Sequence, residues 1–312
     1  MNVELQPELP ALRLEDWTPA RDTLHLWAQI VGKVKLASTT PRNHFWHAAL
    51  YPDVGGLTTG RIGLGRVRFA IDFDLVGHRL VVRVGDGREG SFPLADGLSV
   101  AEFDRRLHEL LAGFGLDVDI VERPHGGPEP EATPFGQDTG HASYDPEAAH
   151  RFWVALDWVA LVLEEFAGRF QGRQSPVHLF WHSFELVLTR FSGRPAPPGE
   201  DADPVTREAY SHEQITFGFL PGDRAISFPA FYAVIWPEPD GLSEHQLAPE
   251  QASWRPVATG TMALLDYDAV RTAADPRATL LAFLESAYEA GAGAAYWDRD
   301  ELAWHQQGAP TR

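Results

Sequence analysis

The stretch RVRFAIDFDLVGHRLVVRVGDGREGSFP, residues 66–93, decides the fold class of this chain. From Phe69 to Phe73, apolar residues alternate with charged or small ones, which is the pattern of a strand with one buried face. Residues 76–78 and 85–87 interrupt the alternation with glycine-containing turns. We therefore predict an antiparallel meander of three strands.

Helices are predicted on both sides of these strands. Apolar residues recur at spacings of three and four from Leu24 to Val34, and Pro41 ends the pattern. Ser99, with Glu102 three residues later, has the form of a capping box. Two Asp-Pro pairs open two further helices. The four predicted helices cover residues 15–38, 99–115, 145–170 and 275–297.

The sequence also reads as two related halves, residues 15–123 and 145–305, joined by the loop 124–144. Each half has a long helix, a strand containing Phe-Trp-His, a meander and a closing helix. The first Phe-Trp-His starts 135 residues before the second, at Phe45 and Phe180. We predict a single α+β domain over residues 1–312. Its two related α-β(meander)-α halves would form a large antiparallel sheet with helices packed on it, around a pseudo-two-fold axis.

The segment 177–191, VHLFWHSFELVLTRF, allows two interpretations. On a helix, His178 and His182 would share one face, and a His-x3-His pair can bind one metal ion. On a strand, residues four apart lie about 13 Å apart and cannot bind the same ion. Pro176, the aromatic residues and the shorter partner HFWHAALY, residues 44–51, favour a strand.

On the strand interpretation, His47 and His182 occupy equivalent places in the two halves. We predict that the pseudo-two-fold axis brings them together as metal ligands, with His44, His178 or Glu213 completing the set. Imidazole and carboxylate ligands suit one divalent ion, of zinc, iron or manganese. The alternative is that these histidines are half-buried strand residues bonded to backbone carbonyl groups.

Aromatic residues surround these histidines in the sequence, so we also predict a pocket for an apolar or aromatic small molecule. Core packing against the helices is the alternative explanation of the same residues. The predicted pocket-lining residues are Trp46, Phe180, Trp181, Phe184, Arg190 and His212.

Two weaker candidates complete the search. The first is Ser211-His212-Glu213 at the start of a predicted strand, for which strand-end polarity is the alternative. Its His212-Glu213 does not begin an HExxH zinc motif, and neither does His108-Glu109, because the second histidine is missing. Asp138 and His141 lie in a glycine-containing loop that could aim both side chains at one point. Turn and capping chemistry is the alternative for this second pair.

Composition excludes several classes of protein. The chain has 312 residues and a formal charge of −18, which disfavours binding to nucleic acids and to anionic membranes. It has no cysteine, so disulfides, thiolate nucleophiles and iron–sulfur clusters are excluded. The acidic, proline-containing start MNVELQPELP predicts no signal peptide, and the most apolar long stretch is too short to span a membrane. We expect a cytoplasmic protein.

These observations favour a metal-dependent enzyme that acts on a small molecule. Two alternatives stay open: a non-catalytic small-molecule binding protein with an aromatic-lined pocket, and a structural or partner-binding protein. The three differ in a testable way. An enzyme of this kind needs at least three ligand side chains near one point beside a cavity, a binding protein needs only the cavity, and a partner-binding protein needs an exposed apolar patch.

Several long segments resemble a bacterial family of unknown function, the one numbered five-nine-nine-six. The resemblance covers about residues 15–300. It implies a full-length single unit of bacterial, cytoplasmic origin, and it supplies no activity and no catalytic residues. The segments that carry it are TLHLWAQIVGKVKLA, NHFWHAALY, SPVHLFWHSFELVLTRFSGR, EAYSHE and FLESAYEAGAGAAYWD.

Overall fold

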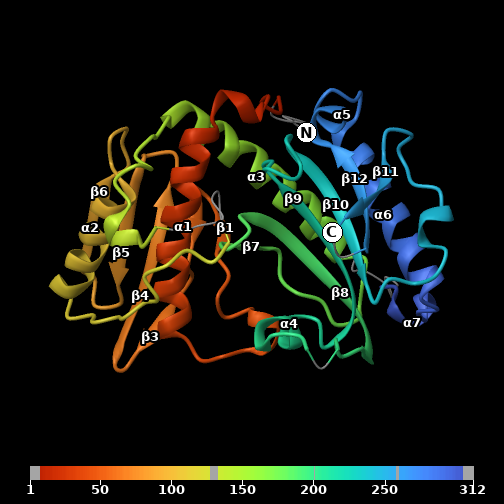
Figure 1. The fold of residues 1–312 in the computed structure, drawn as a ribbon, viewed down its shortest axis with the longest axis horizontal. Helices are drawn as coiled ribbons and strands as arrows, with labels where there is room; N and C mark the ends of the chain where they lie inside the picture. Colours follow the sequence, from red (N-terminus) through yellow and green to blue (C-terminus); the bar gives the residue numbers. More distant parts are fainter. Residues whose placement is uncertain (1–7, 127–132, 200, 258–259, 305–312) are drawn as a thin grey trace, which may run out of the picture.

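A computed structural model describes residues 8–126, 133–199, 201–257 and 260–304 of the chain (Figure 1). Its first part consists of α1 (Thr18–Ser38), β1 (Tyr51–Asp53), β2 (Gly56–Thr58), β3 (Ile62–Leu64), β4 (Val67–Asp74), β5 (Arg79–Val84), β6 (Glu89–Pro93) and α2 (Val100–Gly113).

The second part repeats this order with longer strands and additional short helices. It consists of α3 (Pro146–Ala167), β7 (His178–Phe180), β8 (Glu185–Pro195), α4 (Pro204–Ala209), β9 (His212–Leu220), β10 (Ala230–Trp236), β11 (Ser253–Val257), β12 (Gly260–Asp266), α5 (Tyr267–Arg271), α6 (Pro276–Ala294) and α7 (Arg299–Leu302). Short 3-10 turns lie at Leu14–Asp16, Asn43–Phe45, Phe135–Gln137 and Leu242–Glu244.

The strands form two antiparallel sheets of six strands each. The first has the order β1-β2-β4-β5-β6, with β3 paired to β4, and the second has the order β11-β12-β10-β9-β8-β7. The α+β class and the antiparallel sheets are thus confirmed. In each part a long helix precedes six strands and another helix follows them, which is the order that a duplication would leave, and the duplication itself stays a prediction.

The two sheets meet at one pair of residues. Leu50, directly before β1, and Leu179, in the middle of β7, exchange two backbone hydrogen bonds of 2.9 and 2.8 Å. The junction is antiparallel, so the strand order continues from one sheet into the other.

Helices cover one face of each sheet. In the first sheet, the alternating residues of β4 place Phe73 against Phe103 of α2, and Phe103 in turn stacks on Trp27 of α1. In the second sheet, Phe217 of β9 packs edge-on against Phe166 of α3. One continuous cluster of buried apolar residues extends through both parts, so the two halves share a core.

The helix boundaries follow the predicted signals. The Ser99 side chain accepts a hydrogen bond from the Glu102 backbone N–H at the start of α2. Asp145 and Asp275 cap α3 and α6 in the same way, each followed by a proline in the first turn. None of the helices in the described ranges is both long enough and apolar enough to cross a membrane.

The strand predicted at residues 44–51 is largely wrong. Residues 44–49 form a 3-10 turn and a loop, because His44 and Phe45 adopt left-handed backbone angles, with φ of 53° and 55°, and extended pairing begins only at Leu50 and Tyr51. Residues 116–122 alternate like a strand but pair with no strand in the described parts of the chain.

The segment 177–191 is extended, so its helical interpretation is wrong. It forms a tight hairpin of β7 and β8 in place of one long strand. The turn closes with Phe184, whose φ is 60° and whose N–H bonds the Phe180 carbonyl at 2.8 Å.

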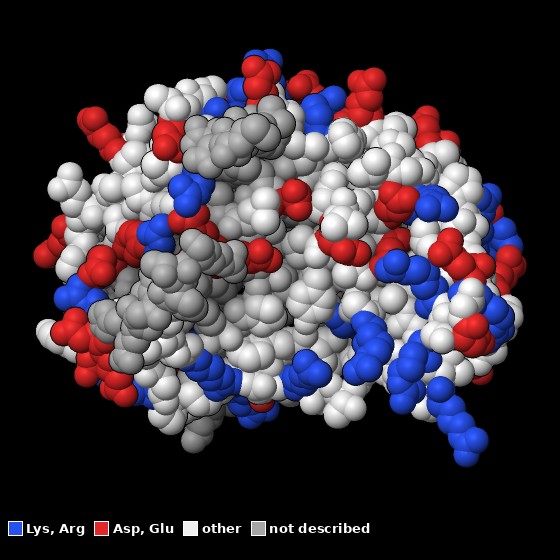
Figure 2. Space-filling model, turned by 180° about the vertical axis from the view of Figure 1, so that it is seen from behind, with Lys and Arg blue, Asp and Glu red and all other residues white. Residues whose placement is uncertain are grey.

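Charged side chains of both signs mix on the face shown in Figure 2, where a group of basic side chains gathers toward the lower right. Many of the described charges are paired with opposite ones. Arg105 of α2, for example, bonds both Glu102 and Glu109 on the same helix.

Candidate functional site

Three of the histidines predicted as metal ligands, His44, His47 and His178, have hydrogen-bond partners of their own. His178 is fully buried in β7, and its Nδ1–H donates to the Pro176 carbonyl at 2.7 Å. Its Nε2 is buried without a hydrogen bond beside the Phe180 ring. Burial lowers the pKa of His178 to about 4, so the ring is neutral at pH 7.

His44 and His47 are also buried. His44 Nδ1 bonds the Ala209 carbonyl at 3.1 Å, and its ring lies 5.8 Å from the ring of His212. His47 Nδ1 accepts the Arg42 backbone N–H at 3.1 Å. Burial lowers the pKa of both His44 and His47. His44 therefore pairs with a backbone carbonyl, as in the alternative explanation, whereas His47 pairs with a backbone N–H, and neither residue lies on a strand.

His182 and Glu213 do not form a metal-ligand group with these histidines. His182 is exposed, and its ring lies 6.1 Å from the ring of His125. Glu213 of β9 forms an ion pair of 2.6 Å with Arg194. Among the described residues, none of the five predicted ligands belongs to a group of three ligand side chains close enough to share an ion.

The predicted pocket-lining residues separate into several environments. Trp181 is buried, donates from Nε1 to the Ala48 carbonyl at 3.0 Å and packs directly on Gly32 of α1. Phe184 is buried and stacks on His25. Both therefore pack in the core.

The remaining members of that set lie apart from these two. Arg173 lies over the ring of Trp46, and Phe180 packs against a small apolar cluster on the uncovered face of the second sheet. His212 is near His44, whereas Arg190 is buried on the helix-covered face beside Phe166.

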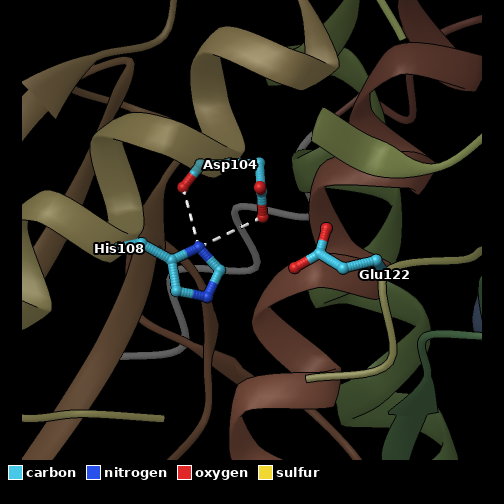
Figure 3. A group of neighbouring side chains, drawn as sticks. All are labelled: Asp104, His108 and Glu122. Carbon is cyan, nitrogen blue, oxygen red and sulfur yellow. Dashed lines mark hydrogen bonds and ion pairs between the residues drawn. The ribbon is translucent and has the colours of Figure 1, made fainter. Parts of the chain in front are cut away.

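A different group meets the geometric requirement for an ion. Asp104 and His108 lie one turn apart on α2, and Glu122 comes from the segment that follows this helix (Figure 3). One ligand atom from each of the three side chains lies within 4.8 Å of the other two. This is the one such group found in the described part of the chain.

The local structure explains why these side chains meet. The apolar face of α2, with Phe103 and Leu107, is buried, which leaves Asp104 and His108 at its edge. The backbone N–H of Phe135 donates to the Glu122 carbonyl at 2.8 Å and holds the following segment beside the helix.

The loop with Asp138 and His141 supports the same helix from its N-terminus. The Asp138 carbonyl accepts the N–H of Ala101, and the His141 carbonyl accepts the N–H of Val100. The Asp138 carboxylate also bonds His141 Nδ1 at 2.8 Å. These bonds are the turn and capping chemistry that was the alternative for this pair.

The hydrogen bonds of Asp104 and His108 leave one oxygen poorly satisfied. His108 Nδ1–H donates to the Asp104 backbone carbonyl at 3.0 Å, and Asp104 Oδ1 lies 3.2 Å from the same nitrogen. Because the N–H is directed at the carbonyl, buried Oδ1 has no well-directed hydrogen bond. The Asp104 carboxylate raises the pKa of His108 to about 9.

A buried lysine lies near this group. Lys33 of α1 is 7% exposed, and its ammonium lies 5.5 Å from the Trp181 ring centroid and 6.0 Å from that of Phe135. Burial lowers the pKa of Lys33, and the negative charge of Glu122 opposes this shift.

The group opens into a cavity of about 930 Å³. Most charged side chains around the cavity are acidic, so its potential is negative. The ionisable lining residues are Glu102, Asp104, Arg105, His108, Glu109, Asp117, Asp119 and Glu122.

The three donors fit a divalent ion of the predicted kinds. One imidazole and two carboxylates suit zinc, iron or manganese, and the two negative charges balance a dication. The unsatisfied Asp104 Oδ1 is an oxygen that an ion would satisfy. Three protein ligands beside a cavity would leave coordination positions for water and substrate, as in catalytic sites.

In the sequence, His108 stood out only as part of an incomplete HExxH motif, and none of Asp104, His108 and Glu122 was predicted as a ligand. The spacing Asp104-x3-His108 inside a predicted helix places both side chains on one face, and this signal was present. Glu122 comes from a segment whose position depends on tertiary structure, so no local pattern could have indicated it.

The comparisons with known proteins identify a family without an activity. No curated protein and no solved structure matches the chain. The profile of the family described as "Family of unknown function (DUF5996)" matches residues 9–304. This match spans nearly the whole chain, as the sequence resemblance implied, and the chain therefore belongs to the DUF5996 family of unknown function.

Proposed function

We propose that this protein is a divalent-metal-dependent enzyme acting on a small molecule, with the ion bound by Asp104, His108 and Glu122. The observation that carries the proposal is their convergence within 4.8 Å beside a cavity, with Asp104 Oδ1 buried and poorly bonded. His108 would bind the ion through Nε2, because its Nδ1–H is held by the Asp104 carbonyl. Since the pKa of His108 is about 9 without an ion, binding at neutral pH would release the Nε2 proton to solvent.

Zinc, iron or manganese bound there would activate a water molecule or polarise a substrate carbonyl. The protein's own contribution is to orient the ligands and to select the substrate by charge. Because the other carboxylates of the cavity, such as Glu109, Asp117 and Asp119, are negative, the cavity favours neutral or cationic substrates over anionic ones.

We also infer a bacterial, cytoplasmic protein that binds no nucleic acid. The net charge of −18 repels phosphate backbones, and the resemblance to the family carries the inferred origin.

Metal titration with a matched pair of variants tests the proposal. We expect isothermal titration with Zn²⁺ or Mn²⁺ to show one site per chain, weakened at least about tenfold by Glu122→Gln. Asp119→Asn is the control, because Asp119 lines the same cavity outside the three-residue group. No metal binding by the wild-type protein, or equal losses in both variants, would contradict the proposal.

A further inference from the structure

A second cavity, of about 370 Å³, lies at the opposite end of the molecule from α2, beside α6 and α7 (Figure 1). Its lining comes from the end of α3, from β8, from α6 and from the α7 region. The residues that line it are Arg169, Phe170, Arg190, Glu285, Tyr288, Glu289, Arg299, Asp300 and Ala303.

Arg190 of β8 is the unusual member of this lining. It is 1% exposed, and its guanidinium carbon lies 3.5 Å from the centroid of the Phe166 ring and 4.8 Å from that of Tyr288. Within the described ranges its guanidinium donates one hydrogen bond, from one Nη to the Phe166 carbonyl, and its Nε is buried without a partner. A buried guanidinium usually has a carboxylate partner, because burying an unpaired charge is costly.

The other two arginines of the lining already have carboxylates. Arg169 forms ion pairs with Glu165 and Glu285, and Arg299 forms one with Glu289. Their charges are therefore paired inside the protein, whereas Arg190 feels the charge of Glu285 but forms no ion pair of its own in the described structure.

Asp300 is the counterpart of Arg190 among the acidic residues. Its side chain is exposed, and in the described structure it takes part in no hydrogen bond or ion pair. The cavity thus offers one unpaired cation in its buried part and one unpaired anion in its exposed part. Phe170, Tyr288 and Ala303 contribute apolar surface to the same lining.

We propose that this cavity binds a small amino-acid-like zwitterion, whose carboxylate pairs with Arg190 and whose ammonium pairs with Asp300. A guanidinium fork suits a carboxylate, with two parallel N–H···O bonds. A simple carboxylate would pair with Arg190 but could not pair with Asp300. A simple amine would pair with Asp300 but could not pair with Arg190. The aromatic and alanine surface accommodates a short aliphatic side chain.

Three probes that share one carbon chain test this assignment: L-norvaline, pentanoate and pentylamine. Binding is measured by titration calorimetry. The buffer contains EDTA, so that the amino acid does not chelate any metal ion. We expect norvaline to bind at one site, pentanoate at least about tenfold more weakly and pentylamine not measurably.

Two variants assign the contacts. Asp300→Asn changes an exposed side chain, so we expect it to fold normally, to bind norvaline at least about tenfold more weakly than the wild type does, and to bind pentanoate no more weakly, because a negative charge near the carboxylate is removed. Arg190→Met should lose both ligands, and circular dichroism checks its fold. The proposal is overturned if the wild type binds neither norvaline nor pentanoate at millimolar concentration, if it binds the two equally, or if Asp300→Asn binds norvaline like the wild type.

Discussion

Leu50 and Leu179 join the two sheets by a reciprocal pair of backbone hydrogen bonds, 2.9 and 2.8 Å long. Both side chains are fully buried in the core that the two parts of the chain share. The bonds and the common core couple the halves energetically.

We therefore predict that the protein unfolds in one cooperative transition. Differential scanning calorimetry should give one peak, with a calorimetric enthalpy equal to the van't Hoff enthalpy. Two separate peaks, or a van't Hoff enthalpy near half the calorimetric value, would instead show that the halves unfold independently.

The contact between Trp181 and Gly32 predicts a large effect of one methyl group. A Cβ at residue 32 would lie 2.1 Å from Cδ1 of Trp181, in a buried helix. We expect Gly32→Ala to lower the free energy of unfolding by about 1–3 kcal/mol, because the core must shift to admit it.

Gly113 of α2 is the matched control, since a Cβ there meets nothing within 4 Å. Gly113→Ala should be neutral or raise the free energy of unfolding by up to about 1 kcal/mol. Urea denaturation measures both variants, and equal effects would show that the Trp181 contact is unimportant.

The buried ring of His178 predicts a pH dependence of stability. Its pKa is about 4 in the folded protein and 6.5 when exposed, so between these values only the unfolded state binds the proton. Stability is therefore fully present above pH 6.5 and falls as the pH drops toward 4.

One histidine contributes a slope of up to about 1.4 kcal/mol per pH unit in that window. In His178→Gln, we expect the free energy of unfolding to change less steeply with pH than in the wild type, by up to this amount. This difference in slope does not depend on the stability of the variant at pH 7. Denaturation curves from pH 4.5 to 6.5 provide the slopes, and parallel curves for the two proteins would rule out this role of His178.

The two lysines of α1 should respond differently to replacement by methionine. Lys33 is buried among aromatic rings with no hydrogen bond to its ammonium in the described structure, so Lys33→Met should raise the free energy of unfolding by about 1 kcal/mol. Lys35 donates to the Ala49 carbonyl and lies 4.3 Å from the Tyr51 ring centroid, so Lys35→Met should lower it. Destabilisation by Lys33→Met would indicate that its charge is well satisfied.

Much of the fold could be predicted because its signals are local. The alternation around Phe69 and the cap at Ser99 each reflect the geometry of a single element, and both predictions are confirmed. Residues 44–49 were mispredicted because consecutive left-handed residues at His44 and Phe45 leave no trace in a hydrophobic pattern.

The candidate site was less predictable than the fold. The helix of Asp104 and His108 was predicted, but Glu122 reaches them through a loop held by tertiary contacts. The histidines that stand out in the sequence are largely paired with backbone groups, as at His178 and His44. Their residue type made them candidate ligands in the sequence. The convergence of side chains in the structure instead favours Asp104, His108 and Glu122.

The position of a bound ion tests the central claim most directly. Crystals of the protein grown with Zn²⁺ should be measured on both sides of the zinc absorption edge, so that anomalous density locates the metal. The account predicts one peak bonded to His108, Asp104 and Glu122 at about 2.0–2.2 Å. A peak at His44 and His212 instead, or no ordered peak, would contradict it.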